Sequence, residues 1–222
     1  MIYVIADIHG CYKKYKDMLK EIRFPEKDLL YVLGDVIDRG DDGIKILFDM
    51  MMRPNVIPIM GNHEMMAYTV LKKLNVEITE ENYNEYLDEE MIQMYQEWMV
   101  NGGNTTVKAF LKLTAEEKES LLEYLEEFSL YEEAEISGKE YVLVYVGINN
   151  FDEDKSLDEY LPEDFLFSNC DYNQVYYPNK FLVSVHTPTF TINEESKGKI
   201  LIKKQSYSDR LWSCISGNIR LC

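Results

Sequence analysis

The chain has few of the features that mark several common classes of protein. Its four cysteines lack CxxC spacing, which argues against a zinc knuckle or a disulfide framework and fits a reducing cytoplasm. It contains no apolar run of about 18 residues, the length that a membrane span needs. The N-terminus begins directly with the strand-like IYVIA and lacks the three regions of a signal peptide. We therefore expect a cytoplasmic protein with no membrane partner.

Basic residues are also scarce, since 23 Lys and Arg face 40 Asp and Glu and the net charge is −17. Nucleic-acid-binding domains usually show the opposite balance, so we expect no nucleic-acid partner. The acidic residues are concentrated in residues 77–135, which hold 17 acidic and 3 basic residues and so carry −14 of the total charge. A solvated helical face is the simpler interpretation, and a surface for a basic partner is the alternative.

Strand and helix signals alternate in the first third of the chain. Three buried runs are each followed by a helical pattern: IYVIA (2–6), LLYVLG (29–34) and NVIPIM (55–60). This alternation predicts an α/β fold with a parallel sheet built from βαβ units. Further strands are expected at 141–147, 181–187, 198–204 and near 211–221.

Residues 80–128 predict helices. An apolar stripe at helical spacing comprises Leu87, Met91, Met94, Tyr95 and Trp98, and it indicates a helix that packs on its own domain rather than a cofactor site. Thr114 and Glu117 form a capping box that predicts a helix start. With 222 residues and 46% hydrophobic content, we expect a single domain over 1–222 with an acidic helical insert at about 77–135.

Polar segments follow each of the first three predicted strands. They are DIHG at 7–10, GDVIDRG at 34–40 and GNHE at 61–64. The carboxyl ends of parallel strands share one edge, so these segments should converge. Imidazole and carboxylate together bind Mn, Fe or Zn, and one carboxylate can bridge two ions about 3.5–4 Å apart. Each segment alone could be a charged turn, but the three in order predict a metal centre.

These three segments resemble the first motifs of the phosphoprotein phosphatase branch of the calcineurin-like metallophosphoesterases, particularly its bacterial and phage serine/threonine phosphatases. Trp98 with the NGGNTT of 101–106, and the VHTPT of 185–189, are similar to the bacterial subgroup. The resemblance spans most of the chain and is stronger in the first 110 residues. It implies a four-layer αββα metallophosphoesterase sandwich, here with the helical insert.

The resemblance also implies a cofactor of two divalent metal ions, manganese first, with iron or zinc as alternatives. Asp7, His9 and Asp35 would hold the first ion, with Asp35 as the bridge between the two. Asn62 and His186 would hold the second ion. In the family a histidine completes this second set of ligands.

The implied activity is a metal-dependent phosphomonoester hydrolase of the serine/threonine protein phosphatase type, acting on a phosphorylated protein or a small phosphoester. A hydroxide activated by the two ions would attack phosphorus. His63, oriented by Asp38, would act as the general acid that protonates the leaving oxygen. Arg39 and Asn62 would bind the phosphate, because a planar guanidinium suits bidentate contact with phosphate oxygens.

The chain departs from the family where the second ion would bind. VLVYVGINN (142–150) has Tyr145 at the position of the ligand histidine, and all three histidines of the chain are already assigned. Three interpretations stay open: Tyr145 ligates the ion as a phenolate, water or Asn149 or Asn150 completes the shell, or the second site is weak or empty.

Two further departures affect the same half of the site. Asn169 stands where the family has a second phosphate-binding arginine, and DRLWSCISGN (209–218) replaces its usual C-terminal stretch. Loss of a charged contact to the transition state can cost a few kcal/mol, so we expect low activity. The alternatives are a catalytically impaired pseudophosphatase that binds metal or phosphate as an interaction module, and a hydrolase like the dinucleoside tetraphosphatases, which share these motifs.

Overall fold

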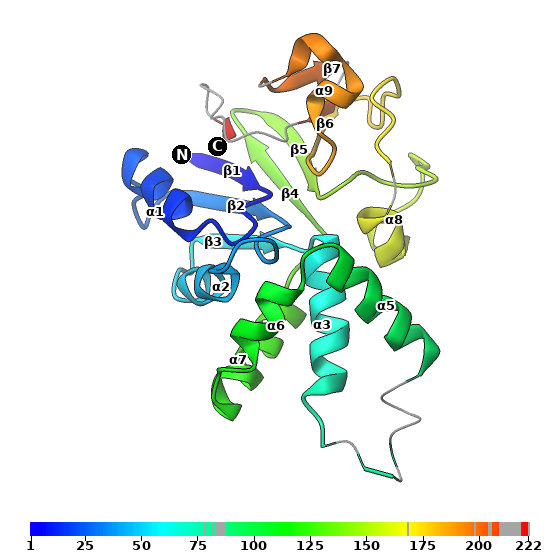
Figure 1. The fold of residues 1–222 in the computed structure, drawn as a ribbon. Coiled ribbons are helices and arrows are strands. Elements are labelled where there is room, and N and C mark those ends of the chain that lie inside the picture. The colour runs from blue at the N-terminus through cyan, green and yellow to red at the C-terminus, as the bar shows by residue number, and fades with distance from the viewer. Residues whose placement is uncertain are drawn as a thin grey trace.

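The protein folds into two β-sheets with helices on their outer sides (Figure 1). The computed structural model describes residues 1–77, 79–80, 82, 88–167, 169–197, 199–203, 206–208 and 219–221. The predicted stretch DRLWSCISGN (209–218) therefore lies outside the described residues, as does Leu87 of the predicted apolar stripe.

The first sheet is parallel throughout, as the βαβ pattern predicts. Its strands are β1 (Ile2–Ala6), β2 (Leu29–Leu33), β3 (Val56–Ile59) and β9 (Ile219–Leu221), in the order β3-β2-β1-β9. The helices that follow its first three strands are α1 (Tyr12–Glu21), α2 (Gly43–Met51) and α3 (Asn62–Leu74). The last segment of the chain thus returns to pair with the first strand.

The second sheet comes from the C-terminal half of the chain. Its strands are β4 (Tyr131–Ile136), β5 (Lys139–Val144), β6 (Lys180–Ser184), β8 (Ser206–Ser208) and β7 (Leu201–Lys203), in that spatial order. The pairs β4–β5 and β7–β8 are antiparallel, and the other two are parallel. Strands β5, β6 and β7 confirm the predictions at 141–147, 181–187 and 198–204, whereas β4 and β8 were not predicted. Of the strand expected near 211–221, the described residues contain β9.

In the described part of the predicted helical region lie the helices α5 (Glu89–Val100), α6 (Asn104–Phe110) and α7 (Ala115–Glu126). The capping box of Thr114 and Glu117 is confirmed at the start of α7. Helices α5 and α7 pack against α3, and α6 packs against α2. The helical insert was expected to extend to residue 135, but its last helix ends at Glu126. Strand β4, which begins at Tyr131, belongs to the second sheet. The organisation of 1–222 as one domain stays a prediction.

The C-terminal half of the chain also contains shorter elements. They are the 3-10 helices Leu157–Glu159 and Glu194–Ser196 and the helices α8 (Pro162–Leu166) and α9 (Thr189–Ile192). No helix in the described part of the chain has the length and apolar character that crossing a membrane requires.

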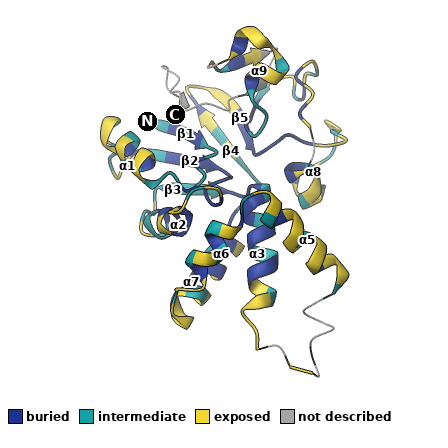
Figure 2. Cartoon of the chain, viewed as in Figure 1, coloured by how far each residue is buried: buried dark blue, intermediate teal, exposed yellow. Residues whose placement is uncertain are grey.

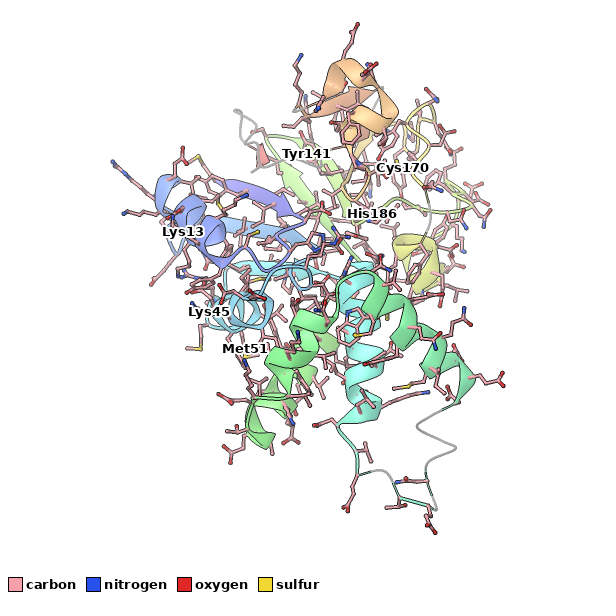
Figure 3. The ribbon with its side chains drawn as sticks, viewed as in Figure 1. Lys13, Lys45, Met51, Tyr141, Cys170 and His186 are labelled. Atoms are coloured by element: carbon pink, nitrogen blue, oxygen red, sulfur yellow. The ribbon has the colours of Figure 1, made fainter. Side chains whose placement is uncertain are left out.

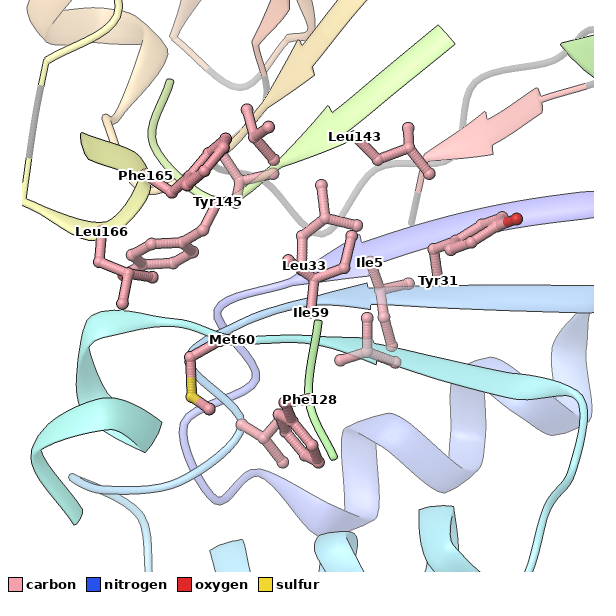
Figure 4. Packing of buried hydrophobic residues seen from close by; sticks show 14 of the residues in the cluster. Ile5, Tyr31, Leu33, Ile59, Met60, Phe128, Leu143, Tyr145, Phe165 and Leu166 are labelled. Carbon is pink, nitrogen blue, oxygen red and sulfur yellow. The ribbon is translucent and has the colours of Figure 1, made fainter. Parts of the chain in front are cut away.

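One hydrophobic core joins the two sheets. Figure 4 shows Ile5, Leu33 and Ile59 of the first sheet facing the same buried cluster as Leu143 of the second. In Figure 2 the buried residues gather in the sheets and on the inner sides of the helices, while exposed residues lie on the outer helix faces. Burial of apolar side chains on both sheets stabilises their face-to-face packing. This arrangement confirms the predicted α/β sandwich.

Candidate active site

The three polar segments meet at the carboxyl edge of the first sheet, as predicted. The backbone N–H of Asp7 donates to the carbonyl of Gly34 at 3.2 Å, and that of His9 donates to the carbonyl of Asp35 at 2.9 Å. The N–H of Gly34 in turn donates to the carbonyl of Ile59 at 2.9 Å. These bonds continue the sheet beyond its strands and set the three loops side by side.

Several site residues have left-handed backbone conformations, with φ between +44° and +69°: Asp7, His9, Asp35, Asp38, Arg39 and His186. Such conformations cost residues other than glycine about 1–3 kcal/mol each and cluster at functional sites. Here they turn consecutive side chains toward one point. The loops also touch, since a Cβ added to Gly40 would lie 2.4 Å from the carbonyl oxygen of His9.

His9 and Asp35 provide an imidazole and a carboxylate side by side. Nε2 of His9 lies 3.3 Å from Oδ2 of Asp35, and its Nδ1 lies 2.9 Å from the carbonyl of Ile37. Because a carbonyl only accepts, Nδ1 donates and Nε2 of the neutral ring keeps its lone pair. Metal-binding histidines are typically oriented in this way. Possible ligand atoms of His9, Asp35 and His63 all lie within 4.8 Å of one another.

Asp35 has the environment of a metal ligand. The residue is 1% exposed, and neither carboxylate oxygen accepts a hydrogen bond from the described residues. Burial alone would raise the pKa of this carboxyl, but His9 and His63 lower it below its usual value. A buried carboxylate is costly unless a cation compensates it. The residues at this point therefore fit a divalent ion.

Asp38 and His63 form a buried pair that is held from several sides. Nδ1 of His63 donates to Oδ2 of Asp38 at 2.6 Å, and the indole N–H of Trp98 donates to the same oxygen at 2.7 Å. The hydroxyl of Thr106 donates to Oδ1 at 2.5 Å. Burial opposes protonation of His63, but the bond to Asp38 and the nearby carboxylates raise its pKa above the ordinary value.

Arg39 lies beside both His9 and His63. The residue is exposed, and its Nη1 lies 2.7 Å from Nε2 of His9 while its Nη2 lies 3.2 Å from Nε2 of His63. With Nδ1 of both rings already donating, both Nε2 atoms can accept from the guanidinium. One planar group therefore faces both histidines.

Glu64 supports the loops from beneath, a role that the sequence did not reveal. Its carboxylate accepts hydrogen bonds from the backbone N–H groups of Asp35 and Val36 at 2.8 Å and of Ile37 and Gly61 at 3.2 Å. Burial, followed by the charge of Asp35, raises the pKa of Glu64 to about 7. These four bonds join the loop after β2 to the start of α3.

The residues predicted for a second ion also come together, but around a hydroxyl group. Tyr145 donates from its hydroxyl to Oδ1 of Asn62 at 2.7 Å, and the same oxygen lies 2.6 Å from Nδ1 of His186. Figure 3 places His186 centrally, where the sheets approach the helices. Burial and the charges of Asp35 and Asp7 raise the pKa of Tyr145 well above its ordinary value.

Three predicted candidates lie elsewhere. Asn149 and Asn150 are exposed, and the backbone N–H of Asn149 donates to the carbonyl of Asp164 at 3.0 Å. Asn169 is exposed as well. The contacts of the Tyr145 hydroxyl are with Asn62 and His186 rather than with these asparagines.

Sequence reasoning also missed the role of two residues outside the first sheet. Trp98 of α5 and Thr106 of α6 both donate to Asp38. The only signal for them was the resemblance of Trp98 and the NGGNTT segment to the bacterial subgroup. Their contacts with Asp38 span 60 and 68 positions of sequence, which no local pattern predicts.

Comparison with known proteins agrees with this geometry. The family model for calcineurin-like phosphoesterases matches residues 1–205, and the chain therefore belongs to that family. Its members are metallophosphoesterases, a superfamily of hydrolases. The predicted resemblance and the predicted fold class are thus confirmed.

Relatives of two kinds match the chain. Serine/threonine-protein phosphatase 2 of Salmonella typhimurium is 31% identical over 160 residues, which are 71% of this chain and 64% of that protein. The symmetrical bis(5'-nucleosyl)-tetraphosphatase of Wigglesworthia glossinidia brevipalpis is 40% identical over 80 residues, or 34% of this chain and 29% of that protein. The chain spans less than two thirds of the length of either relative.

A solved structure shares the fold. The crystal structure of a protein named as a candidate diadenosine tetraphosphatase aligns with a TM-score of 0.56 at 13% identity. The alignment covers 93% of this chain and 86% of that one. At this identity the likeness concerns the fold alone.

Proposed function

We propose that the chain is a metal-dependent phosphomonoester hydrolase of the serine/threonine protein phosphatase type. The observation that carries the proposal is the placement of Arg39 between His9 and His63, beside the buried carboxylate of Asp35. The proposed cation site, phosphate-binding group and proton donor would thus lie close together. The relative that covers the most of this chain among those described above is a protein phosphatase.

The proposed cation site consists of Asp7, His9 and Asp35. Asp7 follows β1 directly, and its backbone bond to Gly34 sets it beside the loop that carries Asp35. Two carboxylates and one imidazole suit Mn²⁺, with iron or zinc as alternatives. When bound, a divalent ion lowers the pKa of a water molecule and offsets negative charge on the phosphoryl group.

Arg39 would bind the phosphate, with Asn62 as a second contact. The exposed guanidinium of Arg39 offers several N–H donors in one plane, which match two phosphate oxygens at once. In the absence of phosphate these donors face His9 and His63. Substrate oxygens would replace the two imidazoles as acceptors, and this would place the phosphorus close to both histidines.

His63 would protonate the leaving oxygen as the general acid. Its Nδ1 is held by Asp38, so the proton would be delivered from Nε2, which faces Arg39 and the expected phosphate position. The raised pKa of His63 keeps a larger fraction of the imidazole protonated near neutral pH. Asp38 would stabilise the charged ring and hold its orientation.

Hydrolysis of p-nitrophenyl phosphate with added Mn²⁺ tests the proposal. We expect turnover that depends on the metal and is lost in Asp35→Asn. This substitution replaces the carboxylate with a neutral amide and leaves the size of the side chain nearly unchanged. Asp17→Asn is the matched control, because Asp17 is an exposed residue that pairs with Lys13. Turnover no higher in the unmodified protein than in Asp35→Asn would sink the proposal and favour the pseudophosphatase.

The second candidate function is hydrolysis of dinucleoside tetraphosphates. The observation that favours it is the 40% identity to the Wigglesworthia tetraphosphatase over 80 residues. Parallel assays with a phosphoserine peptide and with diadenosine tetraphosphate separate the two. We expect the peptide to be the better substrate, and a preference for the dinucleotide would assign the chain to the tetraphosphatase type.

We also propose a cytoplasmic location for the protein, which the scattered cysteines support.

A further inference from the structure

The hydroxyl of Tyr145 lies at the point where the side chains of Asn62 and His186 converge. Its oxygen is 2.7 Å from Oδ1 of Asn62 and 2.6 Å from Nδ1 of His186. A carbonyl oxygen and an imidazole nitrogen are both good ligands for a transition-metal ion. Here each of them is instead directed at the same phenol oxygen.

The Tyr145 hydroxyl has a single proton, and this decides which atom donates in each of these two hydrogen bonds. Oδ1 of Asn62 can only accept, so the single proton of the Tyr145 hydroxyl points to it. Nδ1 of His186 must then donate to the phenol oxygen, which places the proton of the neutral ring on Nδ1. Nδ1 of His186 therefore has no lone pair for a metal ion, and only Nε2 of the ring keeps one. The two atoms that face this point, Oδ1 of Asn62 and Nδ1 of His186, are both hydrogen-bonded to Tyr145.

The tyrosine ring is packed so that its hydroxyl stays at this point. Tyr145 is 0% exposed and belongs to the buried cluster shown in Figure 4. On one side it lies so close to Gly34 that a Cβ there would be 2.6 Å from its Cδ2 atom. On another side it meets the His186 ring edge-on, with centroids 5.0 Å apart. Close packing of this kind leaves the ring little room to turn away.

We propose that the Tyr145 hydroxyl takes the place of a second metal ion, so that the chain binds one divalent ion rather than two. An ion would need to lie about 2.0–2.2 Å from its nitrogen and oxygen ligands, and the phenol oxygen already fills the space between Asn62 and His186. The proposal rests on the first cation site described under the proposed function. It selects, among the three interpretations of Tyr145, the one in which no second ion is held.

Metal stoichiometry tests the proposal without reference to turnover. The full-length protein is stripped of metal and titrated with Mn²⁺, with bound ions counted by elemental analysis and spin coupling between ions followed by electron paramagnetic resonance. We expect one Mn²⁺ per chain and the uncoupled signal of a single ion. Tyr145→Phe removes only the hydroxyl and should also bind one ion, since it adds no ligand to Asn62, His186 and the bridging Asp35.

Tyr145→His is the variant expected to differ. An imidazole is smaller than a phenol and adds a further ligand to Asn62, His186 and the bridging Asp35, so we expect two Mn²⁺ per chain and a spin-coupled signal. Circular dichroism would establish that each variant is folded. A folded Tyr145→His variant that binds one ion would contradict the proposal. If that variant does not fold, the numbers of Mn²⁺ bound by the unmodified protein and by Tyr145→Phe test the proposal instead.

The remaining outcomes separate this proposal from the proposed function. Two ions in the unmodified protein, with or without a tyrosinate absorption change on metal addition, would overturn it. A protein that binds no ion would overturn it too, together with the cation site at Asp35. One ion without hydrolysis of any phosphoester would uphold the stoichiometry and refute the proposed activity alone.

Discussion

The indole nitrogen of Trp98 lies 2.7 Å from the same carboxylate oxygen of Asp38 that accepts a hydrogen bond from His63 at 2.6 Å. Trp98 is fully buried and belongs to α5, in the acidic helical region rather than in the first sheet. Thr106 of α6 donates to the other oxygen of Asp38. The helical region therefore positions the proposed proton donor of a site that is otherwise built on strand ends.

Trp98→Phe should impair catalysis through Asp38. The substitution keeps an aromatic ring but removes the donor, which leaves the buried carboxylate one hydrogen bond short. We expect kcat to fall about tenfold, equivalent to about 1.4 kcal/mol in the barrier, with KM little changed. Steady-state kinetics with p-nitrophenyl phosphate measure this, and Tyr95→Phe on the exposed side of the same helix is the control. An unchanged kcat in Trp98→Phe would show that its bond to Asp38 has no part in the reaction.

Arg39→Lys should weaken phosphate binding. Lysine keeps the charge but cannot present two coplanar donors, which Arg39 directs at His9 and His63. We expect kcat/KM to fall about a hundredfold, a loss typical of one removed transition-state contact. Inorganic phosphate should inhibit this variant at higher concentrations than the unmodified protein. The control is Arg53→Lys, where the arginine pairs with Asp49. Equal inhibition of both variants by phosphate would argue against the role of Arg39.

Asp49→Asn should lower stability in a way that depends on pH. Burial alone would raise the pKa of Asp49, but hydrogen bonds from Arg53 and Lys16 lower it below 3.8. A lowered pKa in the folded state gives stability that is present above about pH 4 and is lost as the pH falls through the folded value. Both partners are partly exposed, so screening limits the effect to about 1 kcal/mol. Urea unfolding should show this difference in the free energy of unfolding at pH 7. At pH 3 the free energies of the variant and the unmodified protein should become more similar. A difference that is equal at both pH values would contradict the electrostatic explanation.

Gly40→Ala should disrupt the site by steric overlap. The added Cβ would lie 2.4 Å from the carbonyl oxygen of His9 and 3.0 Å from the carbonyl carbon of Gly10, and both of these atoms belong to the backbone. We expect losses of both stability and metal binding, since the loops after β1 and β2 must separate. Gly138→Ala is the comparison, because its Cβ meets nothing within 4 Å but its φ is +75°, which should cost about 1 kcal/mol of stability alone. Thermal unfolding and Mn²⁺ titration of both variants test this, and normal metal binding in Gly40→Ala would contradict it.

Local patterns were sufficient for the framework of the fold. The runs at 2–6, 29–34 and 55–60 became parallel strands, because each is apolar on both faces and is followed by a helix. The stretch 131–136 was missed, because YEEAEI has the acidic composition of the helices before it and is only partly buried. Tyr95 of the predicted stripe is exposed, since α5 buries a narrower face than the periodicity indicates.

The sequence by itself determined which polar segments would meet. Parallel strands carry their carboxyl ends to one edge, so DIHG, GDVIDRG and GNHE had to converge once the strands were recognised. Only the tertiary structure decided what the Tyr145 hydroxyl contacts, because Asn62 and His186 are 83 and 41 positions away along the chain. Those contacts depend on how the second sheet packs on the first, and packing of distant side chains leaves no periodic trace in the sequence.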